Sequence, residues 1–169
     1  MSASTDYLTA RPAARAGRAM RQALRGAAAL CFAAGWHPAL AAPSCTFNTV
    51  APSSFGVYDV FALVANNNGV GSLTIHCQGG GPQAVVALST GQSNTYAPRR
   101  MKSGANTMSY NLYTSAGRTV VWGDGSGASQ TLAISANSTT TLSIFGQIPA
   151  GQDAAVGAYS DSVTAVVNF

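Results

Sequence analysis

Hydrophobic and polar residues alternate along the last thirteen positions of the chain, residues 157–169. One parity is largely apolar and holds Tyr159, Val163, Ala165, Val167 and Phe169, whereas the other holds Ser160, Ser162, Thr164 and Asn168. Successive side chains of a strand point to opposite faces, so the pattern predicts a terminal strand with one apolar face. Asp161 interrupts the apolar parity and Val166 the polar one. Since no further apolar segment follows in this sequence, we expect the strand to leave an open edge that suits a partner strand.

Shorter apolar runs recur upstream between Gly, Pro and Asn turn signals, and no helical period follows residue 42. The predicted strands are 45–50 with 55–58, 72–77, 84–88, 108–114, 118–122, 131–135 and 140–145. Residues 91–104 are predicted to form a long polar loop, and 66–69, 79–82 and 123–127 to form turns. Many short strands with such turns favour one all-β sandwich domain, with a barrel as the alternative.

The first 41 residues have the pattern of a secretory signal peptide. Five arginines between positions 11 and 25 precede an apolar run at 26–35, and Ala39-Leu40-Ala41 offers small residues to a signal peptidase. The apolar run is shorter than the roughly 20 residues of a membrane-spanning helix. We therefore predict cleavage after Ala41 and a mature domain of residues 42–169, with Met20 as an alternative start to Met1.

Removing this leader changes the charge of the protein. The whole chain has a net charge of +4, but five of its nine cationic residues lie in the leader. The remaining four are balanced by four aspartates, so the sequence gives no reason to expect a nucleic-acid partner. Two cysteines remain, Cys45 and Cys77. In an exported chain these most simply form one disulfide.

Catalytic and metal-binding patterns are poor in the mature sequence, so we expect neither an enzyme nor a cofactor. His76 is its only histidine, and its neighbours Ile75 and Cys77 place it on the polar face of a strand. A Ser-His-Asp triad would have to use this residue. A Cys-His-Cys set lacks the fourth ligand of a structural zinc site. The loop at 123–127 lacks the Lys and the spaced acids of a phosphate or calcium site.

Two kinds of side chain are candidates for contact with an external surface. Arg99 and Arg100 belong to the only basic cluster, which could meet an anionic surface. The aromatic residues Tyr96, Tyr113 and Trp122 lie near predicted loops, where they could stack on a sugar. Packing within hairpins is the favoured alternative for these aromatics.

Five motifs occur in a recognisable order along the mature sequence. They are Tyr96-Ala97-Pro98-Arg99-Arg100-Met101, Tyr110-Asn111-Leu112-Tyr113-Thr114, Arg118-Thr119-Val120-Val121-Trp122-Gly123-Asp124-Gly125, Gly146-Gln147-Ile148-Pro149-Ala150-Gly151-Gln152 and Gly157-Ala158-Tyr159-Ser160-Asp161-Ser162-Val163. Together they resemble the spore coat protein U domain, which is shared with Csu-type fimbrial subunits of archaic chaperone–usher pili. The resemblance covers residues 45–169.

This resemblance implies an immunoglobulin-like β-sandwich that lacks its last strand and has a disulfide between its first two strands. It implies that a periplasmic chaperone lends the missing strand, and that at the outer-membrane usher the N-terminal extension of another pilus subunit replaces it. Val163, Ala165, Val167 and Phe169 would line the receiving groove. The Phe169 carboxylate would anchor the chaperone.

The expected function is that of a non-enzymatic structural or adhesive pilus subunit at the cell surface, acting in attachment and biofilm formation. Polymerising members of the family carry a donor strand ahead of the first cysteine, but only Ala42-Pro43-Ser44 precede Cys45 after the predicted cleavage. This predicts a subunit that accepts a strand at the fibre tip and gives none. The alternative is a secreted coat or carbohydrate-binding module that does not polymerise.

Overall fold

The computed structural model describes residues 42–79 and 83–169, and the predicted leader at 1–41 lies outside this part. The described residues form β-strands and one short 3-10 turn. In chain order the elements are β1 (Ser44–Ser54), β2 (Val70–Gln78), β3 (Ala84–Leu88), η1 (Gly91–Ser93), β4 (Arg99–Ser103), β5 (Asn106–Tyr113), β6 (Val121–Trp122), β7 (Ser129–Gln130), β8 (Leu132–Ile134), β9 (Thr139–Gln147) and β10 (Ala165–Asn168).

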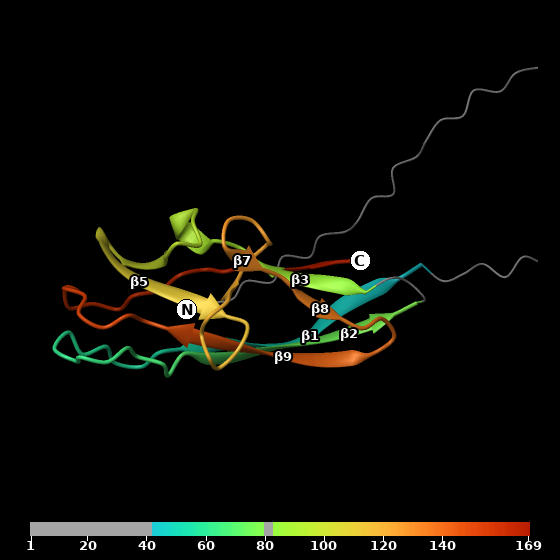
Figure 1. Ribbon diagram of the computed structural model, residues 1–169, viewed down its shortest axis with the longest axis horizontal. Helices are drawn as coiled ribbons and strands as arrows, with labels where there is room; N and C mark the ends of the chain where they lie inside the picture. Colours follow the sequence, from blue (N-terminus) through green and yellow to red (C-terminus); the bar gives the residue numbers. More distant parts are fainter. Residues whose placement is uncertain (1–41, 80–82) are drawn as a thin grey trace, which may run out of the picture. The chain divides into compact units, whose positions relative to one another are not determined.

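The strands make two sheets that stack face to face (Figure 1). The larger sheet has the order β1-β2-β9-β5-β6-β7, with β4 paired to β5, and the smaller sheet has the order β10-β3-β8. All pairs are antiparallel except β6 with β7. The predicted all-β sandwich is confirmed.

The alternation of residues in β2 explains how the larger sheet is oriented. Leu73 and Ile75 point into the sandwich and are 1% and 0% exposed. The polar residues between them face outward, where the His76 ring nitrogen Nδ1 hydrogen-bonds Thr139 Oγ1 of β9 at 2.8 Å. The predicted place of His76 on the polar face of a strand is therefore confirmed.

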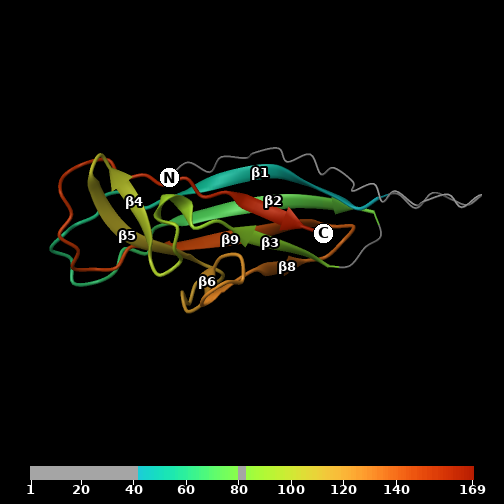
Figure 2. The ribbon, with the colours of Figure 1, turned by 90° about the horizontal axis from the view of Figure 1, so that it is seen from above.

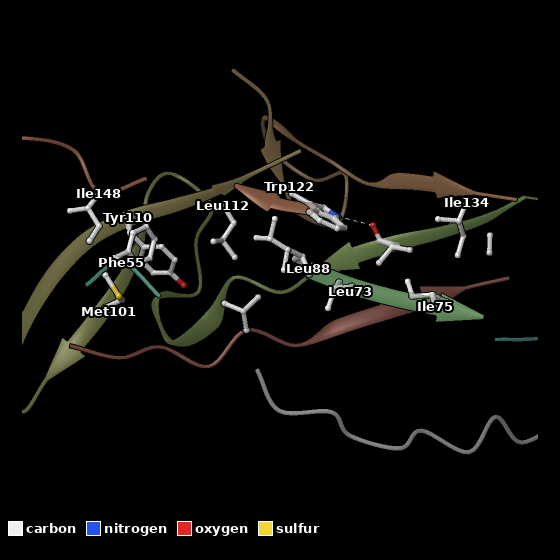
Figure 3. Packing of buried hydrophobic residues seen from close by; sticks show 14 of the residues in the cluster. Phe55, Leu73, Ile75, Leu88, Met101, Tyr110, Leu112, Trp122, Ile134 and Ile148 are labelled. Carbon is white, nitrogen blue, oxygen red and sulfur yellow. Dashed lines mark hydrogen bonds between the residues drawn. The ribbon is translucent and has the colours of Figure 1, made fainter. Parts of the chain in front are cut away.

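The core lies between the two sheets and continues toward the loops beyond β4 and β5 (Figure 3). Trp122 is fully buried, and its indole nitrogen donates a hydrogen bond of 2.9 Å to the backbone carbonyl of Val86. Phe55 and Tyr110 pack edge to face, with ring centroids 6.0 Å apart. Trp122 thus joins the two sheets by a polar contact as well as by its apolar surface.

The disulfide between Cys45 and Cys77 forms as expected. The two residues lie directly opposite each other in the β1–β2 ladder, with a Cα–Cα distance of 4.1 Å. The bond joins the first two strands, as the family resemblance implied. In chain-entropy models a loop of this length contributes roughly 3–4 kcal/mol.

Three sequence predictions need correction. β1 runs from Ser44 to Ser54 and includes Pro52, with a register shift against β2 between Ala51 and Ser54, whereas residues 55–58, predicted as strand, lie outside any strand. β1 is an edge strand, and an edge tolerates a residue that has no amide hydrogen. Residues 91–104 are not simply a loop, because they contain the 3-10 turn and β4. Of residues 118–122 only Val121–Trp122 are strand.

The terminal strand is also shorter than expected. Only Ala165–Asn168 form regular ladder structure, while Ser160 makes an isolated bridge with Lys102 of β4. Even so, Asp161 and Val163 are 1% and 8% exposed, so the predicted inner parity extends through both. Asp161 therefore belongs to the inner face and does not interrupt it.

Candidate functional site

Two edge strands, β1 and β10, lie on the same side of the sandwich. β10 forms a ladder with β3 along one of its edges, and β1 forms a ladder with β2 along one of its edges. Within residues 42–79 and 83–169, no strand pairs with the other edge of either. Figures 1 and 2 show β1 (cyan) and β10 (red, ending at C) at the same side of the two stacked sheets. We call the space between them the open edge.

Inward side chains at the open edge are less buried than the residues directly opposite them. On β1, Phe47 and Val50 are half-buried. Their partners on β2, Ile75 and Leu73, are 0% and 1% exposed. An edge strand with unpaired main-chain groups and partly exposed apolar side chains is a template for pairing with another chain.

The same contrast appears in the smaller sheet. Ala165 and Val167 of β10 are half-buried, although they pack against the core cluster. Their partners on β3, Leu88 and Val86, are 2% and 0% exposed. The inward apolar residues of both edge strands, on β1 and on β10, are therefore half-buried at the open edge.

A buried carboxylate fixes the segment that leads into β10. Asp161 Oδ1 accepts hydrogen bonds from the backbone amides of Gln92 and Ser162, both at 2.8 Å. Its Oδ2 accepts the hydroxyl of Tyr110 at 2.6 Å. Burial, and then the hydrogen bond to Asp161, raise the pKa of Tyr110 well above its usual range, so this hydroxyl stays a donor. Gly91 lies against the carboxylate with φ +65°, and a side chain there would collide with it.

Arg99 closes the same region from the other side. It is fully buried, and its Nε and Nη2 both donate to the Ser89 carbonyl, at 3.0 and 2.8 Å. Nη2 also donates to the Trp122 carbonyl at 2.7 Å, and Nη1 donates to Asn111 Oδ1 at 2.8 Å. Ser89 in turn bonds Thr164 through both its amide and its Oγ, which extends the β3–β10 pairing. Arg99 thereby stabilises the strand beside which β10 lies.

These contacts correct part of the predicted contact surface. Arg99 and Trp122 are both 0% exposed, so neither can touch a sugar or an anionic surface. Tyr96 is half-buried, donates to the Leu88 carbonyl at 2.8 Å, and lies under the Arg99 guanidinium at 4.8 Å. Tyr113 is half-buried as well, and among the five candidates only Arg100 is exposed. Trp122 packs in the core and bonds β3 of the other sheet, and so does more than pack within a hairpin, the alternative given above.

The loops at the end of the domain away from Phe169 have exposed apolar side chains. Val57, Phe61 and Leu63, in the connection from β1 to β2, are 92%, 87% and 96% exposed. Val156, in the connection from β9 to β10, is fully exposed. Figure 2 shows both connections together at the end opposite the label C. We call this region the apolar loop end. Sequence reasoning missed it, because its apolar run does not alternate and was assigned partly to a strand.

The family model of the Spore Coat Protein U domain, which describes the sequences of that family, matches residues 30–166 of the chain. The chain belongs to the Spore Coat Protein U domain family. A similar protein is Protein U of Myxococcus xanthus, which is 32% identical to this chain over 128 residues. The aligned region covers 69% of this chain and 70% of Protein U. The family expected from the five sequence motifs is confirmed.

A solved structure also resembles this spore coat protein U domain. It is the complex of the chaperone CsuC with the tip adhesion subunit CsuE, a pre-assembly complex from archaic chaperone–usher Csu pili of Acinetobacter baumannii. Sequence identity is 20%, the TM-score is 0.49, and the match covers 76% of this chain. The chain spans only 40% of that chain's length, and at this TM-score the likeness establishes nothing further.

The remaining expectations for this spore coat protein U domain concern metal binding and membrane-spanning helices. In the part of the chain that the structure describes, no group of three His, Cys, Asp or Glu side chains is placed to hold a metal ion. No helix in that part is long and apolar enough to cross a membrane. The aspartate of the loop at 123–127 is used locally, since Asp124 Oδ1 accepts the Ser126 amide at 2.8 Å.

Proposed function

We propose that this protein is a non-enzymatic structural or adhesive subunit of a chaperone–usher fimbria, which receives a strand from another protein at its open edge. The observation that supports this most is the difference in burial across the two edge ladders. Phe47, Val50, Ala165 and Val167 are half-buried, and each lies directly opposite a residue that is at most 2% exposed. An added strand would complete their burial.

Recognition of this kind uses the main chain for affinity and alternate side chains for specificity. The free edge of β10 would supply backbone amides and carbonyls, while the incoming apolar side chains would cover the half-buried rows. Fully burying one such side chain contributes about 1.5–3 kcal/mol. We assign the groove to Val163, Ala165, Val167 and Phe169, with the Phe169 carboxylate as the chaperone contact before the usher exchanges partners.

We further propose that the subunit accepts a strand without giving one, which suits the fibre tip. β1 begins at Ser44, and the disulfide of Cys45 holds that end of β1 to β2. After the predicted cleavage only Ala42 and Pro43 precede the strand. A donor needs about five residues, the usual length of a strand. The apolar loop end would then face away from the fibre, and its exposed side chains support a role in attachment and biofilm formation.

A matched pair of variants tests strand acceptance. The chaperone-bound domain, residues 42–169, is mixed with a synthetic peptide that copies the N-terminal extension of a fimbrial subunit encoded beside it. We expect the peptide to release the chaperone and to raise the melting temperature. Val167→Asp puts a charge into the groove and should abolish both effects, whereas Val166→Asp, one residue along and on the other face of the strand, should retain them.

The outcome that contradicts this function is equally concrete. The domain could instead be stable and monomeric without any partner, with a melting temperature that does not change when the peptide is added. That result would favour the secreted coat module that does not polymerise. Long homopolymers joined by strand exchange would instead contradict the tip position.

A further inference from the structure

Residues 55–66 form a loop in the connection from β1 to β2, and most of its large apolar side chains lie in solvent. Val57, Phe61 and Leu63 are 92%, 87% and 96% exposed. Because these side chains make little contact with the domain, their burial contributes little to the order of the loop. Hydrogen bonds at its two ends and within it supply that order instead. We call this segment loop 55–66.

The side chain of Asn66 joins the last residue of the loop to its first turn. Its Nδ2 donates hydrogen bonds to the backbone carbonyls of Phe55 and Val57, at 3.0 and 3.3 Å. Gly56, between these two residues, has φ +68°, which glycine adopts without the strain that a side chain would cause. The left-handed turn at Gly56 thus brings two carbonyls to one amide group, and the half-buried Asn66 closes the loop.

The backbone of Asn66 is itself fixed to the core. Its amide donates to the Ile148 carbonyl and its carbonyl accepts the Ile148 amide, both at 2.9 Å. Ile148 directly follows β9 and is 1% exposed. The Asn66 Oδ1 also accepts the amide of Asn68 at 3.0 Å, on the chain that leads into β2. Asn66 therefore connects the start of the loop, the end of β9 and the approach to β2.

Arg118 holds the residue next to Asn66. Its Nη2 donates to the carbonyl of Asn67 at 2.8 Å. Its Nε and Nη1 donate to the carbonyls of Gly146 and Ala116, at 3.2 and 2.9 Å. Arg118 has φ +50°, a strained conformation for a residue with a long side chain, and such strain persists only where surrounding contacts impose it. Gln147 Nε2 also donates to Asn67 Oδ1, at 2.9 Å.

Polar contacts also order the middle of the loop, where Phe61 lies. Asp59 Oδ1 accepts the Phe61 amide at 2.9 Å, and the Asp59 carbonyl accepts the Ala62 amide at 3.2 Å. The Tyr58 hydroxyl donates to the carbonyl of Pro149 at 2.9 Å, which ties this part of the loop to the connection from β9 to β10. The exposed apolar side chains are thus carried by a backbone whose turns are already formed.

We propose that Asn66 is a positioning residue for attachment: by joining the two ends of loop 55–66, it holds Phe61 and Leu63 ready for an apolar surface before contact. The inference rests on the attachment role proposed above for the apolar loop end. Each flexible side chain that is immobilised on binding lowers the affinity by about two- to tenfold. A loop that is ordered in advance avoids part of this loss.

Binding to octyl-agarose, an apolar matrix, tests the role of Asn66, with unmodified agarose as the blank. Every variant of residues 42–169 is used with the same chaperone or donor peptide bound. Asn66→Ala removes the Nδ2 donor and keeps the backbone bridge to Ile148, so we expect binding to weaken by about tenfold. Hydrogen exchange should become faster at the amides of residues 57–65 and stay unchanged in β2 and β9. Faster exchange throughout the domain would show a general loss of stability and would overturn the proposal.

Asn68→Ala is the matched control. Asn68 is exposed two residues further along, and its amide and carbonyl bond Asn66 Oδ1 and the Val70 amide, at 3.0 and 2.8 Å. Both bonds use the backbone and survive the substitution. This variant should bind octyl-agarose as tightly as the unmodified domain. An equal loss of binding in Asn68→Ala and Asn66→Ala would overturn the assignment to the Asn66 side chain.

A double variant, Phe61→Ser with Leu63→Ser, separates failure of the inference from failure of the attachment role. It should lose most of the binding. If it keeps the binding of the unmodified domain, the apolar loop end is not the attachment surface and the inference falls with it. If the double variant loses binding while Asn66→Ala does not, attachment at the loop stands and the role of Asn66 is wrong.

Asn66→Asp tests the direction of the hydrogen bonds, and does so even if Asn66→Ala fails to fold. At about pH 7 its carboxylate is an acceptor only and would face two carbonyl oxygens, so binding should be weak. These oxygens raise the pKa of that carboxyl group, and near pH 4 the protonated acid regains one O–H donor. Binding should then recover by about two- to tenfold, as one net hydrogen bond predicts.

The same pH change should give no such gain in the unmodified domain or in Asn66→Ala, both of which keep Asp59. An equal gain in either would show that another group of the loop responds to pH. That result, or binding by Asn66→Asp that is already complete at about pH 7, would overturn the proposal.

Discussion

The two halves of the C-terminal segment are built differently. In the first half, Asp161 and Val163 are 1% and 8% exposed, and the carboxylate of Asp161 makes three hydrogen bonds. In the second half, Ala165 and Val167 are half-buried and Phe169 is 52% exposed. One short segment thus passes from a buried interior to a partly exposed edge within a few residues.

This difference explains how an edge can stay ordered without being covered. β10 makes a ladder only with β3, so its own burial stabilises it little. Its position follows from the Asp161 contacts before it and from the Ser89–Thr164 hydrogen bonds beside it. The contacts of the anchored half thus hold β10 beside β3, while the apolar side chains of the other half stay partly exposed.

The largest effect should come from removing the anchor. Asp161→Ala leaves the Tyr110 hydroxyl and the Gln92 amide without their acceptor inside the protein. Each buried group left unpaired costs about 1–3 kcal/mol, so the free energy of unfolding should fall by about 4 kcal/mol. Urea denaturation of the domain in complex with a donor peptide measures this. Asp153→Ala, at an exposed position, is the matched control and should change the value by less than about 0.5 kcal/mol.

Equal stability of the Asp161 and Asp153 variants would show that the first half of the segment is not an anchor. The comparison would then rest on the burial of the two halves and on the bridge between Ser160 and Lys102 alone.

A smaller effect should follow from releasing the other edge strand. The Cys45–Cys77 bond holds the beginning of β1 to β2, as the Asp161 contacts hold the approach to β10. Replacing both cysteines by serine should lower the free energy of unfolding by roughly 3–4 kcal/mol, since the bond closes a loop of moderate length. Urea denaturation in oxidising buffer measures the change. Dithiothreitol should produce the same loss in the unmodified domain and none in the double variant.

The smallest effect concerns alkaline pH. Because burial and Asp161 raise the pKa of Tyr110, the folded state keeps this proton above the pH at which an unfolded tyrosine loses it. The stability contributed by the neutral hydroxyl is therefore complete below about pH 10 and declines as the pH rises further, by about 1.4 kcal/mol per pH unit for one group. Tyr110→Phe should make the decline between pH 10 and 11.5 shallower. An unchanged slope would contradict the assignment.

The inner faces of the long strands could be predicted from the sequence. Leu73 and Ile75 in β2 alternate with polar residues, and this period alone decides which side chains enter the core. The terminal parity likewise placed Val163 and Val167 on the inner side. The two cysteines left in the mature sequence predicted the disulfide, and the family resemblance added its place between the first two strands.

Other features could not be predicted, because they depend on partners that are distant in the sequence. Arg99 looks like a solvated loop charge until the carbonyls of Ser89 and Trp122 are placed around it. Asp161 looks like a break in an apolar face until Tyr110 supplies a donor. The apolar loop end is formed by two connections more than 90 residues apart, which Tyr58 joins by accepting the amide of Gln152.

The central claim is that the domain lacks one strand at its open edge, and fusion of that strand tests it most directly. A donor segment of alternating apolar residues is joined after Phe169 through a Gly-Ser linker, and unfolding by urea is compared with that of the unfused domain. Covering the half-buried rows on β1 and β10 should raise the free energy of unfolding by about 4 kcal/mol or more, at about 1.5–3 kcal/mol for each apolar side chain of the donor that passes from water to full burial. A fused chain that contains Val167→Asp should gain little. If the fusion leaves the stability unchanged while the domain alone unfolds cooperatively, the sandwich is already complete and the claim is wrong.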